Sequence, residues 1–382
     1  MKTIKFLMTA AVALMTAMSF TACSDDDNNP SNYERYQQEV NAAVNSQKHS
    51  EKAILLVAFG STWQQAYDTF DTILKEYKQK FPGWDVYLSF SSAICINQAR
   101  AGENAKDPDY PAEVRKYYDP EHWLTALGKA NYKQIVVQSL QVIPGEEYRR
   151  VRDSYVKDFM NNKNGDFTED YMHSIDKKVA VGIPLMGSDD DVEELANILA
   201  NESDVKTMID GGTVVAFMGH GNPEDYDYFG ANVRYTELEN ALQALHPKKF
   251  YVGTVDMPGN LVDDVYNRMT EDEVTSGSVQ FYPLMSIAGD HAHNDMADED
   301  DPESWFSLFN GWGYEASAYE TIYPKSAACY TKYVAGTDYI PALGERKEVR
   351  KLWMKHTQNA IDAIANGEGL STPTTEVEGE DE

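Results

Sequence analysis

Short, continuous apolar runs alternate with longer amphipathic segments along most of this chain of 382 residues. Because the runs lack an alternation of apolar and polar residues, we expect strands that are buried on both faces. Strands that alternate with helices predict parallel sheets with right-handed crossovers. The expected strands are 53–59, 86–90, 134–140, 178–183, 213–218, 248–255 and 279–287, and the expected helices are 33–46, 62–80, 145–162, 189–200, 235–244, 260–270 and 346–365.

The order of these elements predicts an α/β protein with two similar lobes, each a parallel sheet flanked by helices, on either side of a cleft. We expect an N-terminal lobe over 51–170 and a C-terminal lobe over 171–366. A polar, acidic tether over 23–50 and a disordered tail over 367–382 complete the chain. No sequence repeat relates the lobes, so their similarity rests on element order.

Residues that can bind metal follow three of the expected strands, where ligands gather in open parallel sheets. His220 lies between two glycines, His291 follows Gly289 and Asp290, and Asp256 follows the strand that ends near residue 255. Two imidazoles and a carboxylate form an open set suited to a divalent ion of cobalt, iron, nickel or zinc. The alternative is that each histidine only bonds the backbone of its turn. Three such residues at three strand ends favour the metal site.

Five blocks of the sequence resemble, in the right order, the anaerobic-type sirohydrochlorin cobaltochelatases, which are class II tetrapyrrole chelatases. The blocks are 53–61, 136–148, 218–221, 253–256 and 284–297, and the resemblance covers about 52–365. It implies a lyase that inserts Co²⁺ into sirohydrochlorin or a related tetrapyrrole, as in anaerobic cobalamin biosynthesis, with Fe²⁺, Ni²⁺ or Zn²⁺ as other candidate ions. It also implies His220, Asp256 and His291 as metal ligands and His220 as the catalytic proton acceptor.

Two positions depart from the pattern of that family. Asp256 is one methylene shorter than the glutamate of the family, and Gln141 stands where a histidine is common. Both changes leave open whether the chain still catalyses metal insertion. The second hypothesis is therefore an exported lipoprotein that binds a tetrapyrrole or a metal ion without catalysis.

Four residues are expected to contact the tetrapyrrole: Gln141, Glu147, Tyr226 and Tyr235. Tyrosine rings can stack on a planar macrocycle, and Glu147 can carry protons outward. The alternatives are ordinary packing for the tyrosines and capping of a helix start for Glu147. We expect His293 to support His291 rather than to bind the metal.

The N-terminus reads as an export signal followed by a lipidation site. Residues 1–22 have two lysines ahead of an apolar run and end in small residues, which is typical of a secretory signal. Cys23 comes directly after them and resembles the lipidated cysteine of a lipoprotein; a plain cleaved signal is the alternative. The acidic start at 24–27 resembles that of lipoproteins sent to the outer face of the outer membrane. We expect an exported protein that is lipid-anchored to the outer membrane, periplasmic or surface-exposed.

The overall charge limits which partners the chain can bind. A formal net charge of −29 repels nucleic acid and anionic lipid, so the membrane contact is expected through the lipid anchor only. No phosphate-binding loop and no nucleophile elbow occurs in the sequence. Cys95 and Cys329 are assigned to core positions. The expected partner is a tetrapyrrole, and a homo-oligomer is compatible with the sequence.

Overall fold

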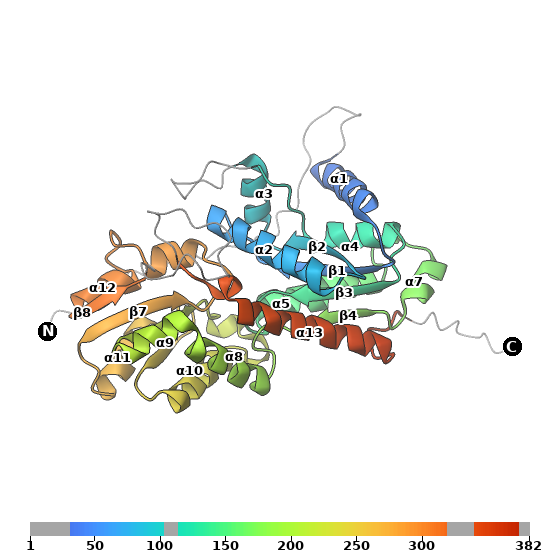
Figure 1. Ribbon diagram of the computed structural model, residues 1–382. Coiled ribbons are helices and arrows are strands. Elements are labelled where there is room, and N and C mark those ends of the chain that lie inside the picture. The colour runs from blue at the N-terminus through green and yellow to red at the C-terminus, as the bar shows by residue number, and fades with distance from the viewer. Residues whose placement is uncertain (1–30, 103–113, 319–339, 374–382) are drawn as a thin grey trace.

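Two parallel four-stranded sheets form the centre of the computed structural model, which describes residues 31–102, 114–318 and 340–373 (Figure 1). The first sheet has the strand order β2-β1-β3-β4 and the second has the order β6-β5-β7-β8. The strands are β1 (Lys52–Ala58), β2 (Asp85–Phe90), β3 (Gln134–Ser139), β4 (Val179–Gly182), β5 (Val214–Gly219), β6 (Phe250–Thr254), β7 (Gly277–Pro283) and β8 (Tyr314–Ser317). The prediction of a two-lobed α/β fold with parallel sheets is confirmed.

Helices connect the strands and cover the sheets. They are α1 (Asn32–Gln47), α2 (Gln64–Lys80), α3 (Ala93–Ala101), α4 (Pro120–Lys129), α5 (Glu146–Arg150), α6 (Lys157–Met160), α7 (Glu169–Ile175), α8 (Asp189–Asn201), α9 (Ser203–Asp210), α10 (Val233–Leu245), α11 (Val262–Glu271), α12 (Trp305–Gly311) and α13 (Lys347–Ala365). Two π-helical segments interrupt the regular pattern, η1 (Val151–Val156) and η4 (Ala292–Met296). Segments of this kind are rare and occur often at functional sites.

The last helix returns to the first lobe, so the expected boundary between residues 170 and 171 does not coincide with the division of the sheets. Strand β4 pairs with β3 through Ile135 and Val179, which places it in the first sheet. Helix α13 packs against β3 and β4 (Figure 1, red). At its start, the buried Arg350 bonds Glu76 of α2 at 2.8 Å, and the buried Arg346 bonds Asp204 of α9 at 3.0 Å. Both lobes are therefore joined to one helix.

The helix expected at 33–46 is present as α1, and the first residues of the expected C-terminal tail are ordered. Ser31 caps α1, and Val40 and Val44 of that helix are fully buried in the core cluster that α4 also enters, so 32–47 of the expected tether belong to the folded body. Beyond α13, the backbone N–H of Leu370 donates to Val179 at 2.8 Å. The expectation of disorder is thus wrong for 367–373, while 374–382 and Cys23 lie outside the described residues.

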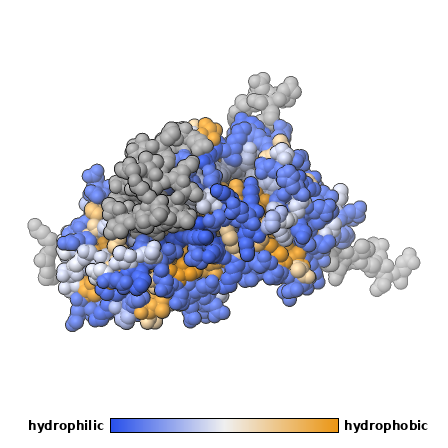
Figure 2. Space-filling view, viewed as in Figure 1, coloured by the Kyte–Doolittle hydropathy of each residue, from blue (hydrophilic) through white to orange (hydrophobic). Residues whose placement is uncertain are grey.

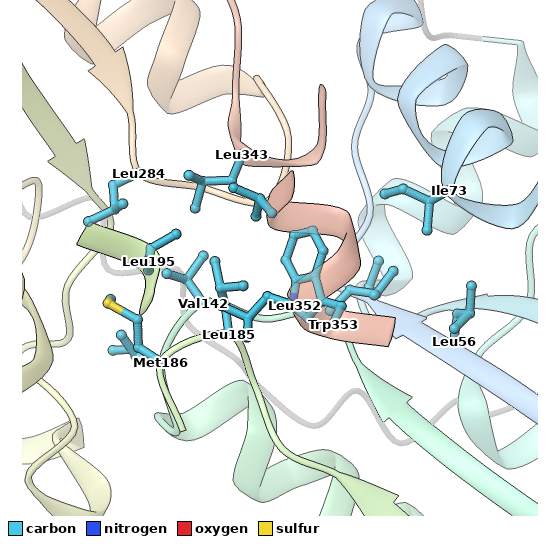
Figure 3. Packing of buried hydrophobic residues seen from close by; sticks show 14 of the residues in the cluster. Leu56, Ile73, Val142, Leu185, Met186, Leu195, Leu284, Leu343, Leu352 and Trp353 are labelled. Carbon is cyan, nitrogen blue, oxygen red and sulfur yellow. The ribbon is translucent and has the colours of Figure 1, made fainter. Parts of the chain in front are cut away.

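A continuous hydrophobic core links the lobes. Figure 3 shows Leu56 of β1, Leu284 beyond β7 and Trp353 of α13 in the same cluster of buried side chains. The surface in view in Figure 2 is mostly hydrophilic, with apolar side chains in small separate areas. Burial of apolar area therefore fixes how the lobes sit relative to each other, which decides where the carboxyl ends of their strands meet.

Candidate metal-exchange site

His220 lies at the carboxyl end of β5, in a turn that only glycine neighbours allow. A Cβ on Gly219 would lie 2.3 Å from the ring of Tyr235, and Gly221 has a positive φ of 77°. The ring nitrogen Nδ1 of His220 lies 2.7 Å from the carbonyl oxygen of Gly221. Because a carbonyl oxygen can only accept, Nδ1 carries the proton and Nε2 keeps a free lone pair.

His291 lies beyond β7, at the start of the π-helix η4. Its Nδ1 lies 2.7 Å from Oδ2 of Asp295, so the proton again sits on Nδ1 and the lone pair on Nε2. This hydrogen bond raises the pKa of His291 above its ordinary value. A carboxylate in this position also fixes the ring orientation and increases the basicity of the nitrogen that faces a metal ion.

The two imidazoles meet at one place. The ring centroids of His220 and His291 are 4.7 Å apart, and the ring planes are nearly perpendicular at 87°. The side chains are 50% and 41% exposed, so both can be reached from solvent. The pair presents two available Nε2 atoms, which is the donor type that divalent cobalt, iron, nickel and zinc accept.

Asp256 lies on the Nδ1 side of His220. Its Oδ2 is 3.7 Å from that nitrogen, and its backbone N–H donates to the His220 carbonyl at 2.9 Å. Among the described residues, no three His, Cys, Asp or Glu side chains surround a common point. The structure thus brings together the two predicted imidazoles and places the shorter Asp256 carboxylate beside one of them. Asp256 as a direct ligand stays a prediction.

Gln141 and Glu147 belong to the rim of the first lobe. The Gln141 side chain accepts a hydrogen bond from Ser139, and its buried Nε2 has no partner. Glu147 accepts a hydrogen bond of 2.9 Å from Ser91, and burial raises the pKa of its carboxyl. A Cβ on Gly145 would lie 3.0 Å from the Asn222 amide, so the turn that precedes Glu147 contacts the loop that follows His220.

Of the two tyrosines predicted to stack on the macrocycle, only one is accessible. Tyr226 is 49% exposed, in a short 3₁₀ turn (Glu224–Tyr226) after His220. Tyr235 is 2% exposed, and its hydroxyl accepts the backbone N–H of Gly221 at 3.2 Å. Burial raises the pKa of Tyr235 to about 12. In this structure the Tyr235 ring packs against the turn that carries His220, and Tyr235 as a contact of the tetrapyrrole stays a prediction.

Sequence reasoning missed a contact between the lobes next to His291. The Trp63 indole, which directly precedes α2, stacks on the His293 imidazole with centroids 3.6 Å apart and planes 6° apart. Its Nε1 donates to Oδ1 of Asp290 at 2.7 Å. Burial lowers the pKa of His293 to about 4, and its Nε2 has no hydrogen-bond partner. The position of Trp63 just past the first strand was the available signal.

Comparisons with known proteins agree with this geometry. A family model described as Cobalt chelatase (CbiK) matches residues 52–362. A sirohydrochlorin cobaltochelatase of Salmonella typhimurium is 26% identical over 316 residues, which cover 81% of this chain and 97% of the relative. The sirohydrochlorin cobaltochelatase CbiKC of Nitratidesulfovibrio vulgaris is 29% identical over 265 residues, 69% of this chain and 81% of the relative.

The fold is also found among solved structures. SirB from Bacillus subtilis with Fe³⁺ superimposes with a TM-score of 0.50 at 14% identity, over 84% of this chain and 99% of that chain. At this identity the likeness concerns the fold alone. It supports the α/β fold described above.

Proposed function

Because the chain belongs to the cobalt chelatase family, which matches it over residues 52–362, we propose that it inserts a divalent metal ion into sirohydrochlorin or a related tetrapyrrole. The resemblance predicted from the sequence is confirmed by that match. The observation that carries the proposal to individual residues is the pair His220 and His291, whose rings meet 4.7 Å apart. Co²⁺ is the ion that we propose, with Fe²⁺, Ni²⁺ and Zn²⁺ as competitors to be tested.

Two neutral imidazoles suit an ion that must be released. Each Nε2 donates one lone pair without adding charge, so the ion is held less tightly than by carboxylates or thiolates around a closed site. Asp295 orients the His291 ring through Nδ1 at 2.7 Å, the Gly221 carbonyl orients His220, and Asp256 lies 3.7 Å from Nδ1 of His220. Open positions on the ion are then available to the pyrrole nitrogens.

The Nε2 atoms of the two imidazoles can also accept the protons that the reaction releases. Insertion forms bonds between the ion and the pyrrole nitrogens, and two pyrrole N–H protons must leave. When the ion moves to the macrocycle, the Nε2 lone pairs of His220 and His291 become free and can each accept one proton. We propose His220 as the first acceptor, because its side chain is 50% exposed and can pass the proton to water.

The alternative of binding without turnover is not favoured. Gln141 removes a titratable group from the rim, and Asp256 shortens a carboxylate, but neither change touches the two Nε2 atoms. The histidine pair that exchange requires is intact, and the curated relatives that the chain resembles are cobaltochelatases.

The test is metallation of sirohydrochlorin by the purified protein with Co²⁺, followed by the change in absorption. His220→Ala and His291→Ala should each lower kcat at least about a hundredfold, as expected when a general acid–base group is removed. His173→Ala is the matched control, because His173 is an exposed side chain on α7. Tight binding of sirohydrochlorin by the wild-type protein without metallation would instead support the binding-only alternative.

We propose in addition that the protein is exported and anchored by lipid at Cys23. The proposal rests on the sequence of 1–23, which lies outside the described residues. In the described part, no helix has the length and apolar character needed to cross a bilayer. Cys23→Ser should abolish incorporation of labelled fatty acid and move the protein from the membrane fraction to the soluble fraction. Unchanged fractionation would contradict the anchor.

A further inference from the structure

Trp63 connects the first lobe to the segment that carries His291. It lies between the turn that follows β1 and helix α2, and its backbone N–H donates to Ser61 Oγ at 3.1 Å. A Cβ on Gly289 would lie 3.7 Å from the same Ser61 Oγ. The two turns, which belong to different sheets, therefore approach within van der Waals contact.

The indole makes two different contacts, and they bracket His291 in the sequence. On one side the Trp63 N–H donates to the Asp290 carboxylate at 2.7 Å, a charge-assisted hydrogen bond. On the other side the ring stacks face to face on His293, with centroids 3.6 Å apart. A segment that is held immediately before and two residues after His291 has little freedom to move that imidazole relative to the first lobe.

A second attachment lies deeper in the molecule and is separate from Trp63. The backbone N–H of Gly344 donates to Ser286 at 2.8 Å, and Glu345 accepts from Thr69 of α2 at 2.9 Å. This chain of bonds connects α2 to the residues that follow β7, but it ends before residue 290. From the first lobe, Trp63 contacts both Asp290 and His293, on either side of His291.

We propose that Trp63 is a positioning residue, which acts through Asp290 and His293 to hold His291 at the distance from the first lobe that metal transfer requires. This inference rests on the proposed function. A tetrapyrrole that contacts both lobes would be positioned by both of them, whereas the metal ion would be positioned by two imidazoles of the second lobe. Trp63 holds the segment that carries His291 in a fixed position relative to the first lobe.

The test compares three variants with a matched control. Trp63→Phe keeps an aromatic ring but loses the N–H, Trp63→Leu loses both contacts, and Asp290→Asn removes the charge from the acceptor. Trp84→Phe is the control, because Trp84 packs on the same core cluster but directly precedes β2, at the opposite end of the sheet from the rim. Each protein is assayed for kcat and KM with Co²⁺ and sirohydrochlorin, and for its melting temperature.

Displacement of a reacting group by about 1 Å costs roughly a hundredfold in rate. We therefore expect Trp63→Leu to lower kcat at least about tenfold, with the KM for Co²⁺ changed less than about threefold. The kcat of Trp63→Phe should lie between those of Trp63→Leu and wild type. The kcat of Trp84→Phe should match wild type. Partial rescue by phenylalanine separates positioning from a general loss of stability. A wild-type kcat in both Trp63→Phe and Trp63→Leu would overturn the proposal, and Trp63→Phe and Asp290→Asn decide it if Trp63→Leu does not fold.

Wild-type turnover is measured in the same experiment, so failure of the proposed function is recognised separately. If the wild-type protein does not metallate sirohydrochlorin, the visible absorption spectrum of Co²⁺ bound to the protein alone decides the role of Trp63. Displacement of His291 should change that spectrum in Trp63→Leu but not in Trp84→Phe. An identical spectrum in both variants would refute positioning.

Discussion

The Nδ1 of His291 donates to Asp295 at 2.7 Å, and this single bond decides which nitrogen of the ring can hold a metal ion. His220 reaches the same state by a different route, with its Nδ1 bonded to the carbonyl of Gly221 at 2.7 Å. One tautomer is thus set by a carboxylate and the other by the backbone. The two imidazoles should therefore respond differently to mutation of their surroundings.

Asp295→Asn should weaken Co²⁺ binding, because a neutral amide can still accept from Nδ1 but polarises the His291 ring less than a carboxylate does. Loss of such a partner typically costs about tenfold to a hundredfold in metal affinity. Isothermal titration of Co²⁺ into the purified protein measures the change. Asp300→Asn, in an exposed loop of the same lobe, is the control. Equal affinities for the two variants would show that the bond to Asp295 does not tune the site.

Asp256→Glu should strengthen Co²⁺ binding if the family's longer side chain reaches the ion, because a third ligand then joins the two imidazoles. Asp256→Ala should cost less affinity than His220→Ala, since the carboxylate lies 3.7 Å from Nδ1 on the side away from the free lone pair. Titration with Co²⁺ measures the affinities of wild type, Asp256→Glu, Asp256→Ala and His220→Ala. A loss in Asp256→Ala as large as in His220→Ala would mean that Asp256 is itself a ligand.

Tyr235→Phe should destabilise the protein by about 1 kcal/mol, the usual net contribution of a hydrogen bond, because the buried N–H of Gly221 loses its acceptor. Gly219→Ala should cost about 1–3 kcal/mol, since its Cβ overlaps the Tyr235 ring. Chemical denaturation measures both. The double variant Gly219→Ala with Tyr235→Leu should recover part of the glycine loss; full additivity would contradict direct overlap.

Stability should fall in acid partly through the buried pair Asp191 and His356, whose side chains lie 3.0 Å apart. Burial opposes ionisation of Asp191, but hydrogen bonds from His356 and Ser188 outweigh it and lower the pKa below 3.8. A lowered pKa means that this contribution is complete above the unfolded value and is lost as the pH falls through the folded value. The difference in unfolding free energy between wild type and Asp191→Asn should therefore be constant near neutral pH and shrink below about pH 4. A difference independent of pH from 2 to 7 would exclude this role.

The sequence predicted the sheets well because buried parallel strands leave continuous apolar runs, as in β1 and β5. It did not predict that β4 joins the first sheet, since four residues carry no information about which neighbour they pair with. Helices α4 and α9, and the edge strand β8, were missed because they are short and lie between stronger patterns. Tertiary pairing, rather than local periodicity, determines these elements.

The residues of the candidate site were likewise predictable only in part. His220 and His291 were predictable because glycine-rich turns after strands place polar side chains at the sheet edge. The burial of Tyr235 was not predictable, because proximity in sequence to His220 says nothing about which face of α10 is buried. Trp63 was missed because an indole is neither titratable nor a metal ligand, and its partners come from a segment more than half the chain away. Only folding brings such partners together.

Helix α13 also has a consequence for when the molecule can fold. The first sheet is synthesised early, yet one of its covering helices is encoded near the end of the chain. Until residue 365 is available, the apolar face of β3 and β4 has no α13 to cover it and should bind chaperones. The delay would suit the export proposed above, because a polypeptide that is translocated unfolded must not complete its fold before nearly all of it has passed. Protease protection of nascent chains that end before and after α13 would measure the effect.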